Sequence, residues 1–230
     1  MNLIKSVFLL VLVSLLASSC YDDPDFSNVP RLTDIDVYTK SVSQSSFDSL
    51  IIRVGFEDGD GDLGIIGNEN EEFFRVPNPN TGEPFWIYRS ENTDQDLPAY
   101  DCENYRYIPL TPGDTIFDTL FVEFNEEYFN YSVSLFTKED GQYQEIDFIG
   151  EPNCGTPLGG RFFPLRDDFS TDSPLKGVIQ WGTVGAYGAQ YRNDTLRVDV
   201  VIRDRAGNVS NAITFDEFTI ESVRRAGEEE

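Results

Sequence analysis

The sequence predicts an all-β protein, an antiparallel β-sandwich with long inserted loops. Runs rich in Val, Ile, Phe, Tyr and Thr recur after residue 29, each bounded by Gly, Asn, Asp or Pro, and such runs are typical of strands. Apolar residues nowhere keep helical spacing over three turns, so helices are not expected. A hydrophobic share of 40% and an aromatic share of 13% exclude a disordered acidic chain and predict a buried core.

The predicted strands follow one another along most of the chain. The first alternates Ile35 and Val37 with Asp34 and Asp36, which is the period of a half-buried strand. An Asp-Gly pair at 140–141, between the third and fourth strands, is a hairpin signal. The strands are expected at residues 32–39, 50–56, 129–137, 143–148, 177–184, 196–203 and 213–222.

Two of these strands belong to an internal repeat. Residues 48–58 match residues 194–204 without gaps, at an offset of 146 residues. Two units are too few for a solenoid, so we interpret them as two core strands of one sandwich. Each strand leads into an acidic turn. In the alignment of the two turns, Asp58 matches Asp204, Gly61 matches Gly207, and Asp62 stands at the position of Asn208.

The second of these turns, Asp-Arg-Ala-Gly-Asn at 204–208, resembles a turn of the immunoglobulin-like domains of bacterial surface proteins. In those domains the second and the next-to-last strands often end in such a turn. The resemblance implies an immunoglobulin-like sandwich, with 48–56 as its second strand and 194–220 as its final hairpin. Residues 177–184 are then expected to pack on that last pair.

The expected sandwich is longer than the roughly 100 residues that such a domain needs. The excess lies in two inserts, residues 65–125 and 150–173, and the first is expected to add strands at 85–88 and 117–124. Long inserts in compact domains are often functional loops. Two stacked small domains with a boundary near residue 151 are the alternative.

Residues 1–19 are expected to be a signal peptide. Lys5 supplies a positive charge, an apolar run too short to span a membrane follows, and small residues precede Cys20. This ending resembles the lipobox of bacterial lipoproteins, although Ala17 stands where Leu is usual. The resemblance implies that Cys20 is acylated and becomes the mature N-terminus. Ordinary secretion with an incidental Cys20 is the alternative.

Acidic residues follow Cys20 directly. Asp22 and Asp23 resemble the surface-export signal of Bacteroidota lipoproteins. The resemblance implies an outer-membrane protein that is lipid-anchored and exposed on the cell surface. Residues 20–29 are interpreted as an acidic tether, 30–223 as the sandwich and 224–230 as a charged tail.

The turn after the second strand predicts a metal site. Asp58, Asp60 and Asp62 alternate with glycines, and three close carboxylates repel each other unless a cation with oxygen ligands binds them. Ca²⁺ accepts six to eight such ligands. The stretch departs from the EF-hand pattern because Leu63 stands at the position of the invariant Gly. A tight turn without an ion is the alternative.

Two further groups of residues carry predictions. With Cys20 acylated, Cys102 and Cys154 are left over from the 3 cysteines, and in an exported chain we expect them to form a disulfide. Two buried free thiols are the alternative. Trp86, Tyr88 and Tyr100 in the first insert are candidates for stacking on sugars or gripping a protein partner, and a place in strand cores is the alternative.

Charge and composition limit the function. The chain has 17 Lys+Arg against 41 Asp+Glu, a net charge of −24, which opposes nucleic-acid binding. The chain contains no histidine, which excludes a Ser-His-Asp triad. We therefore expect a non-catalytic lipoprotein that is a binding or structural module with a protein or glycan partner. A glycan-binding component of a nutrient-uptake system and a carboxylate-dependent hydrolase are the alternatives.

Overall fold

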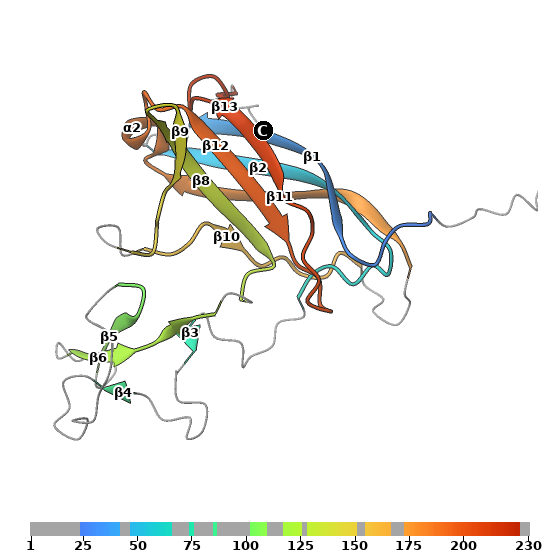
Figure 1. The fold of residues 1–230 in the computed structure, drawn as a ribbon, viewed down its shortest axis with the longest axis horizontal. Coiled ribbons are helices and arrows are strands. Elements are labelled where there is room, and N and C mark those ends of the chain that lie inside the picture. Colours follow the sequence, from blue (N-terminus) through green and yellow to red (C-terminus); the bar gives the residue numbers. More distant parts are fainter. Residues whose placement is uncertain are drawn as a thin grey trace, which may run out of the picture.

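The computed structural model is all-β, as the sequence predicts. Its strands pair in antiparallel sheets, and one short helical turn, α2 (Tyr187–Gln190), interrupts them (Figure 1). The structure describes these residues: 24–41, 47–65, 74–75, 85–86, 102–109, 117–125, 128–150, 155–166 and 173–225.

The first sheet has β2 (Asp48–Asp58) at its centre. It pairs on one side with β1 (Arg31–Ser41) and on the other with β11 (Leu175–Gly185), both antiparallel. The strand expected at 177–184 therefore hydrogen-bonds to β2 and faces the final hairpin across the core. β11 pairs with β2 along its whole length, so the acidic end of β2 lies opposite Leu175.

The second sheet is built around β8 (Tyr131–Glu139) and β12 (Leu196–Ile202). β13 (Ile213–Phe218) pairs with β12, while β9 (Gln142–Glu145) and β10 (Gly159–Gly160) pair with β8. The sheet thus combines strands that come before and after the second insert.

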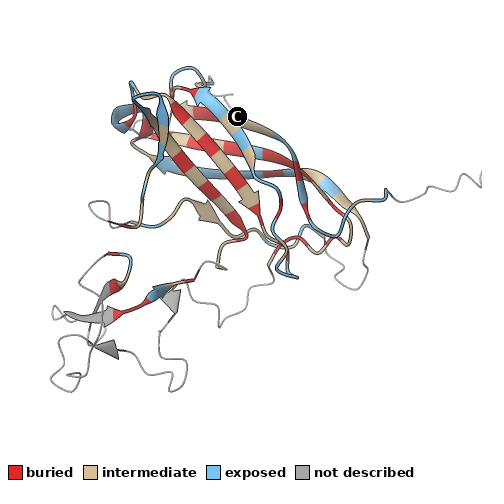
Figure 2. Ribbon diagram, viewed as in Figure 1, coloured by how far each residue is buried: buried red, intermediate tan, exposed pale blue. Residues whose placement is uncertain are grey.

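The two sheets face each other and enclose a hydrophobic core (Figure 2). Every second residue of β2 and β12 is buried, and each apolar side chain in these rows stabilises the fold by roughly 1.5–3 kcal/mol. The rows do not end on apolar residues, because the alternation continues to Asp58 and Asp204, which are also buried. The apolar members of the rows are Leu50, Ile52, Val54, Phe56, Leu196, Val198, Val200 and Ile202.

Smaller sheets form in the first insert, which lies below the sandwich in Figure 1. β3 (Phe74–Arg75) pairs with β7 (Glu123–Phe124). β6 (Phe117–Phe121) pairs with β4 (Phe85–Trp86) and with β5 (Tyr105–Pro109). The insert strands that the sequence predicts correspond to β4 and to β6 with β7.

Candidate metal centre

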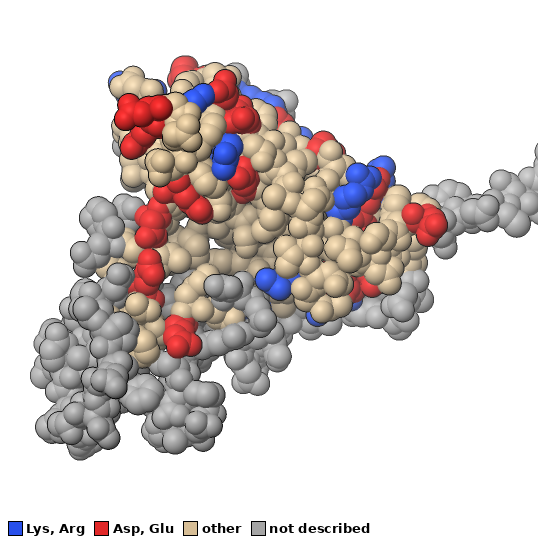
Figure 3. Space-filling model, viewed as in Figure 1, with Lys and Arg blue, Asp and Glu red and all other residues tan. Residues whose placement is uncertain are grey.

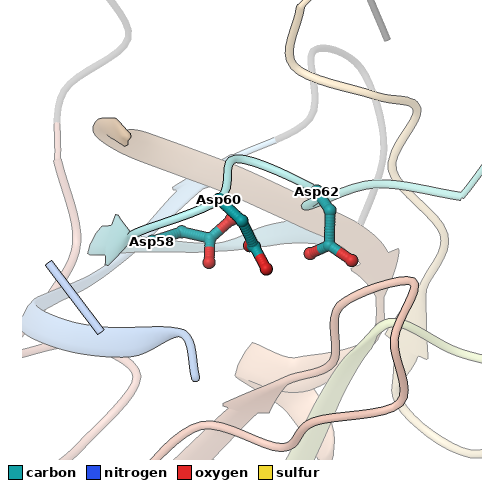
Figure 4. Close-up of side chains that lie close together, drawn as sticks. All are labelled: Asp58, Asp60 and Asp62. Atoms are coloured by element: carbon teal, nitrogen blue, oxygen red, sulfur yellow. The ribbon is translucent and has the colours of Figure 1, made fainter. Parts of the chain in front are cut away.

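The candidate metal centre lies where β2 ends. Asp58 is the last residue of that strand, and Asp60 and Asp62 follow on the loop. Figure 4 shows their three carboxylates on the same side of the loop. Each contributes one oxygen atom to a group in which all oxygens lie within 4.8 Å of one another. We call these three residues the acidic triad.

The local fold follows from the sequence of the loop. Gly61 has a φ of 68°, a left-handed conformation that glycine adopts without strain. It turns the chain so that Asp62 comes back beside the end of β2. Leu63 then fixes the loop, because its side chain is 0% exposed and its backbone bridges to Asp204 in the facing turn.

Asp58 is buried without a hydrogen-bond partner. Its side chain is 0% exposed, and neither carboxylate oxygen accepts a hydrogen bond. One oxygen of Asp60 and one of Asp62 are buried and unpartnered in the same way. Buried polar groups in native proteins are nearly always paired, so these oxygens favour a bound group that satisfies them.

The electrostatics of the site agree with this geometry. Burial, followed by the charges of Asp60, Asp62 and Asp204, raises the pKa of Asp58 from 3.8 to about 7. The backbone N–H of Leu63 opposes this shift, but it is not in hydrogen-bond geometry with either oxygen. At neutral pH the Asp58 carboxylate is therefore only partly ionised, because burial and the neighbouring acidic residues both disfavour its negative charge.

The pKa of Asp62 is raised as well. Burial is the largest cause, and the charges of Asp204 and Asp60 add to it. The backbone N–H of Ala206, which donates to Asp62 Oδ2 at 3.0 Å, and the guanidinium of Arg205 both lower the pKa without reversing the shift. The protein's own positive groups therefore do not neutralise the acidic triad.

The donor set fits a hard cation. The triad offers only oxygen atoms, the ligands that Ca²⁺ prefers, at typical Ca–O distances of about 2.3–2.6 Å. Two ligands on opposite sides of one ion can therefore be about 5 Å apart, and the spacing of 4.8 Å or less allows one ion to contact all three carboxylates. Such an ion would satisfy the unpartnered oxygens and remove the repulsion between the charges.

The structure adds Asp204 to this region, which the sequence prediction did not. Asp204 lies at the end of the facing sheet, and its charge contributes to the raised pKa of Asp58. The internal repeat was the available signal, because it places Asp58 and Asp204 at matching positions of the two central strands.

The predicted aromatic site is not tested by the described residues. Trp86 lies in β4, where its backbone pairs with Leu120, and its side chain is not described. Tyr88 and Tyr100 lie outside the described residues. A sugar-stacking or partner-binding role for the three aromatic residues therefore stays a prediction.

The cysteines are described only in part. Cys102 is buried, with 3% of its surface exposed, just before β5. Cys20 and Cys154 lie outside the described residues. Acylation of Cys20 and the pairing of Cys102 with Cys154 stay predictions.

A cavity of about 280 Å³ lies beside β8, and two other acidic residues, Glu145 and Asp147, are among those that line it. Asp147 Oδ1 accepts hydrogen bonds from the backbone N–H groups of Ile149 at 2.9 Å and of Gly150 at 2.8 Å. These bonds give Asp147 a role in closing the turn after β9. The acidic triad is the better candidate because both oxygens of Asp58, and one oxygen each of Asp60 and Asp62, are buried without a hydrogen-bond partner.

No family model, curated protein or solved structure matches this chain. Within the ranges that the structure describes, helices long and apolar enough to cross a membrane are absent. The function is therefore inferred from the chain's own residues.

Proposed function

We propose that this chain is a non-catalytic, calcium-stabilised β-sandwich that acts as a binding or structural module of a lipid-anchored surface protein. One observation carries the calcium assignment: Asp58 is 0% exposed, lacks hydrogen-bond partners and lies among other carboxylates. Burial of such a group is costly unless a cation compensates it. Asp58, Asp60 and Asp62 are the proposed ligands.

The strand order supports an immunoglobulin-like sandwich. The first sheet has the order β1-β2-β11, and the second contains β13-β12-β8. Taken in chain order, these correspond to the A-B-E and G-F-C strands of immunoglobulin-like domains. β9, which follows β8 and pairs with it, extends the second sheet.

The N-terminal sequence supports the anchored location. A signal-peptide pattern ends at Cys20, and acidic residues follow it. Acylation of Cys20 with two or more chains would hold the module stably at the membrane. With an outer-membrane location, the sandwich would meet its protein or glycan partner at the cell surface. Replacement of Cys20 by Ala should release the protein from membranes, and continued membrane retention would contradict the anchor.

Thermal unfolding with and without calcium tests the metal centre. A ligand that binds only the folded state at about 100 times its Kd stabilises it by about 2.7 kcal/mol. For a chain of this size, that corresponds to a rise in Tm of about 5–10 °C. We expect this rise when millimolar Ca²⁺ replaces EDTA, and an unchanged Tm would contradict the proposal.

Matched variants test whether the calcium-dependent rise in Tm comes from the acidic triad. D58N and D60N each remove a proposed ligand charge, so we expect both to lose most of the calcium-dependent rise in Tm. Asp140, exposed in the turn between β8 and β9, offers the control, because D140N removes the same charge far from the triad. D140N should keep the full response to calcium.

A further inference from the structure

Four exposed apolar residues lie on segments that contact the acidic loop or belong to the turn facing it. Val29, Phe163, Leu165 and Val209 are four of the seven large hydrophobic residues exposed in the described part of the chain. Phe163 is the most exposed of them, at 76%. Scattered exposed hydrophobics are normal on a protein surface, whereas a group at one end of a domain marks an interaction site.

Contacts with the acidic loop hold these residues at the same end of the sandwich. The backbone N–H of Ile65 donates to Phe162 O at 3.0 Å, and Gly64 approaches Pro164 so closely that a Cβ atom would lie 2.4 Å from its Cα. Phe163 and Leu165 flank that proline. Val209 follows the turn whose Ala206 N–H donates to the triad.

The N-terminal segment reaches the sandwich at this end as well. The backbone N–H of Gly59, inside the acidic loop, donates to Ser27 O at 2.8 Å. Ser27 lies seven residues after Cys20, a stretch that spans at most about 25 Å. A lipid on Cys20 would therefore keep the acidic triad within about 25 Å of its attachment point. β2 carries the chain through 11 residues to the opposite end of the sandwich, a length of about 35 Å.

We infer that this end of the sandwich, defined by the acidic triad, Val29, Phe163, Leu165 and Val209, docks on the phospholipid surface that carries the anchor. The inference rests on the proposed function, because it uses both the lipid on Cys20 and the calcium ion. Phe163 and Leu165 insert between the headgroups, and calcium lets the triad approach them.

Docking requires bound calcium as well as the exposed apolar side chains. On the face drawn in Figure 3, basic side chains form only small groups among acidic ones, and the chain carries a net charge of −24. Without an ion, three carboxylates at the contact would repel phosphate headgroups. A bound Ca²⁺ neutralises them and accepts six to eight oxygen ligands, more than three carboxylates supply singly, so headgroup phosphates can complete its shell.

Because the lipid on Cys20 already holds the domain at the membrane, weak insertion of apolar side chains is enough to populate the docked state. Burial of one or two Phe or Leu side chains gives only weak binding from solution. A short flexible tether raises the effective concentration of the domain at the membrane to the millimolar range. The docked state can therefore be populated without a large contact area.

Fluorescence quenching tests the contact. The acylated full-length mature protein is reconstituted into vesicles of phosphatidylethanolamine and phosphatidylglycerol that contain a brominated phosphatidylcholine. A tryptophan probe is placed at the proposed contact with F163W. The matched control is V184W, a 60% exposed position on β11 that lies opposite Ser49, near the other end of β2. Emission of the unsubstituted protein gives the background of Trp86 and Trp181.

With millimolar Ca²⁺, bromolipid quenching of F163W should be several-fold stronger than that of V184W, and EDTA should remove the difference. Equal quenching of the two variants in calcium would overturn the docking surface. Stronger quenching of F163W that EDTA does not change would overturn the role of calcium. The Tm of the same samples with and without calcium reports the metal centre independently, so failure of docking is distinguished from failure of the proposed site.

Discussion

Asp58 and Asp204 occupy matching positions at the ends of the two central strands, but the carboxylate of only one of them is satisfied. Asp204 Oδ1 accepts from the backbone N–H of Asn208 at 2.7 Å, and Asp204 Oδ2 accepts from Asn208 Nδ2 at 2.8 Å. The residue at the position of Asn208 in the first turn is Asp62. The first turn thus replaces a donor by a third acceptor, and in the proposed function a bound cation takes the role there that Asn208 has in the second turn.

This relationship predicts the effect of D62N. The new amide can donate to Asp58 as Asn208 does to Asp204, and its oxygen can still accept from Ala206. A hydrogen bond to a charged group stabilises by about 1.5–3 kcal/mol, so the free energy of unfolding in EDTA should rise by about that amount. The calcium response should shrink, because a ligand charge is lost. Urea unfolding in EDTA and in Ca²⁺ measures both effects.

The reverse substitution provides the control for D62N. N208D removes the partner of Asp204 and adds a charge beside it, so we expect the free energy of unfolding in EDTA to fall. If D62N also lowers stability in EDTA, the equivalence of the two turns would be contradicted.

Much of this fold could be predicted from the sequence because period-two alternation is a local property. It places β2 and β12 correctly and brings the triad to the end of a strand. Strand ends were less accurate. The sequence predicts the last strand at 213–222, but the strand stops at Phe218, since Glu217 has a φ of 50° and Thr219 and Ser222 hydrogen-bond to each other in a turn.

The convergence of the two acidic turns could not be predicted in the same way. It depends on how the sheets face each other, which sequence spacing does not specify. The repeat by itself indicates only that each of the two strands feeds an acidic turn. The structure shows that Asp58 and Asp204 meet at one end of the core and that only Asp204 carries its own hydrogen-bond donor.

The raised pKa of Asp58 predicts how stability depends on pH in EDTA. Between about pH 4 and about pH 7 the folded protein keeps a proton on Asp58 that the unfolded chain has lost, so stability falls as the pH rises through this window. Above that pKa the loss is complete, on the order of a few kcal/mol. Urea unfolding across this range should show a steeper fall for the wild type than for D58N. Parallel curves would contradict the burial argument.

A substitution at Gly61 tests the conformation of the acidic loop after β2. G61A adds a methyl group at a φ of 68°, with its Cβ 2.3 Å from the carbonyl oxygen of Ser173. Gly141 has a φ of 81° but no atom within 4 Å of an added Cβ, so G141A provides the control for backbone strain alone. We expect G141A to lower the free energy of unfolding by about 1–2 kcal/mol and G61A to lower it further. Equal losses in urea unfolding would show that the loop does not pack as described.

The predicted disulfide would join the first insert, through Cys102, to the second insert, through Cys154. A disulfide between Cys102 and Cys154 would close a loop of about 50 residues and stabilise the fold by about 4 kcal/mol in the chain-entropy model. Alkylation of the acylated protein with iodoacetamide in denaturant should add no label until a reductant is present, and then two, as intact mass would show. Reduction should also lower the Tm. The double variant C102A/C154A, which lacks both thiols, is the control, since its Tm should not respond to reductant. Labelling of both thiols without reductant would contradict the bridge.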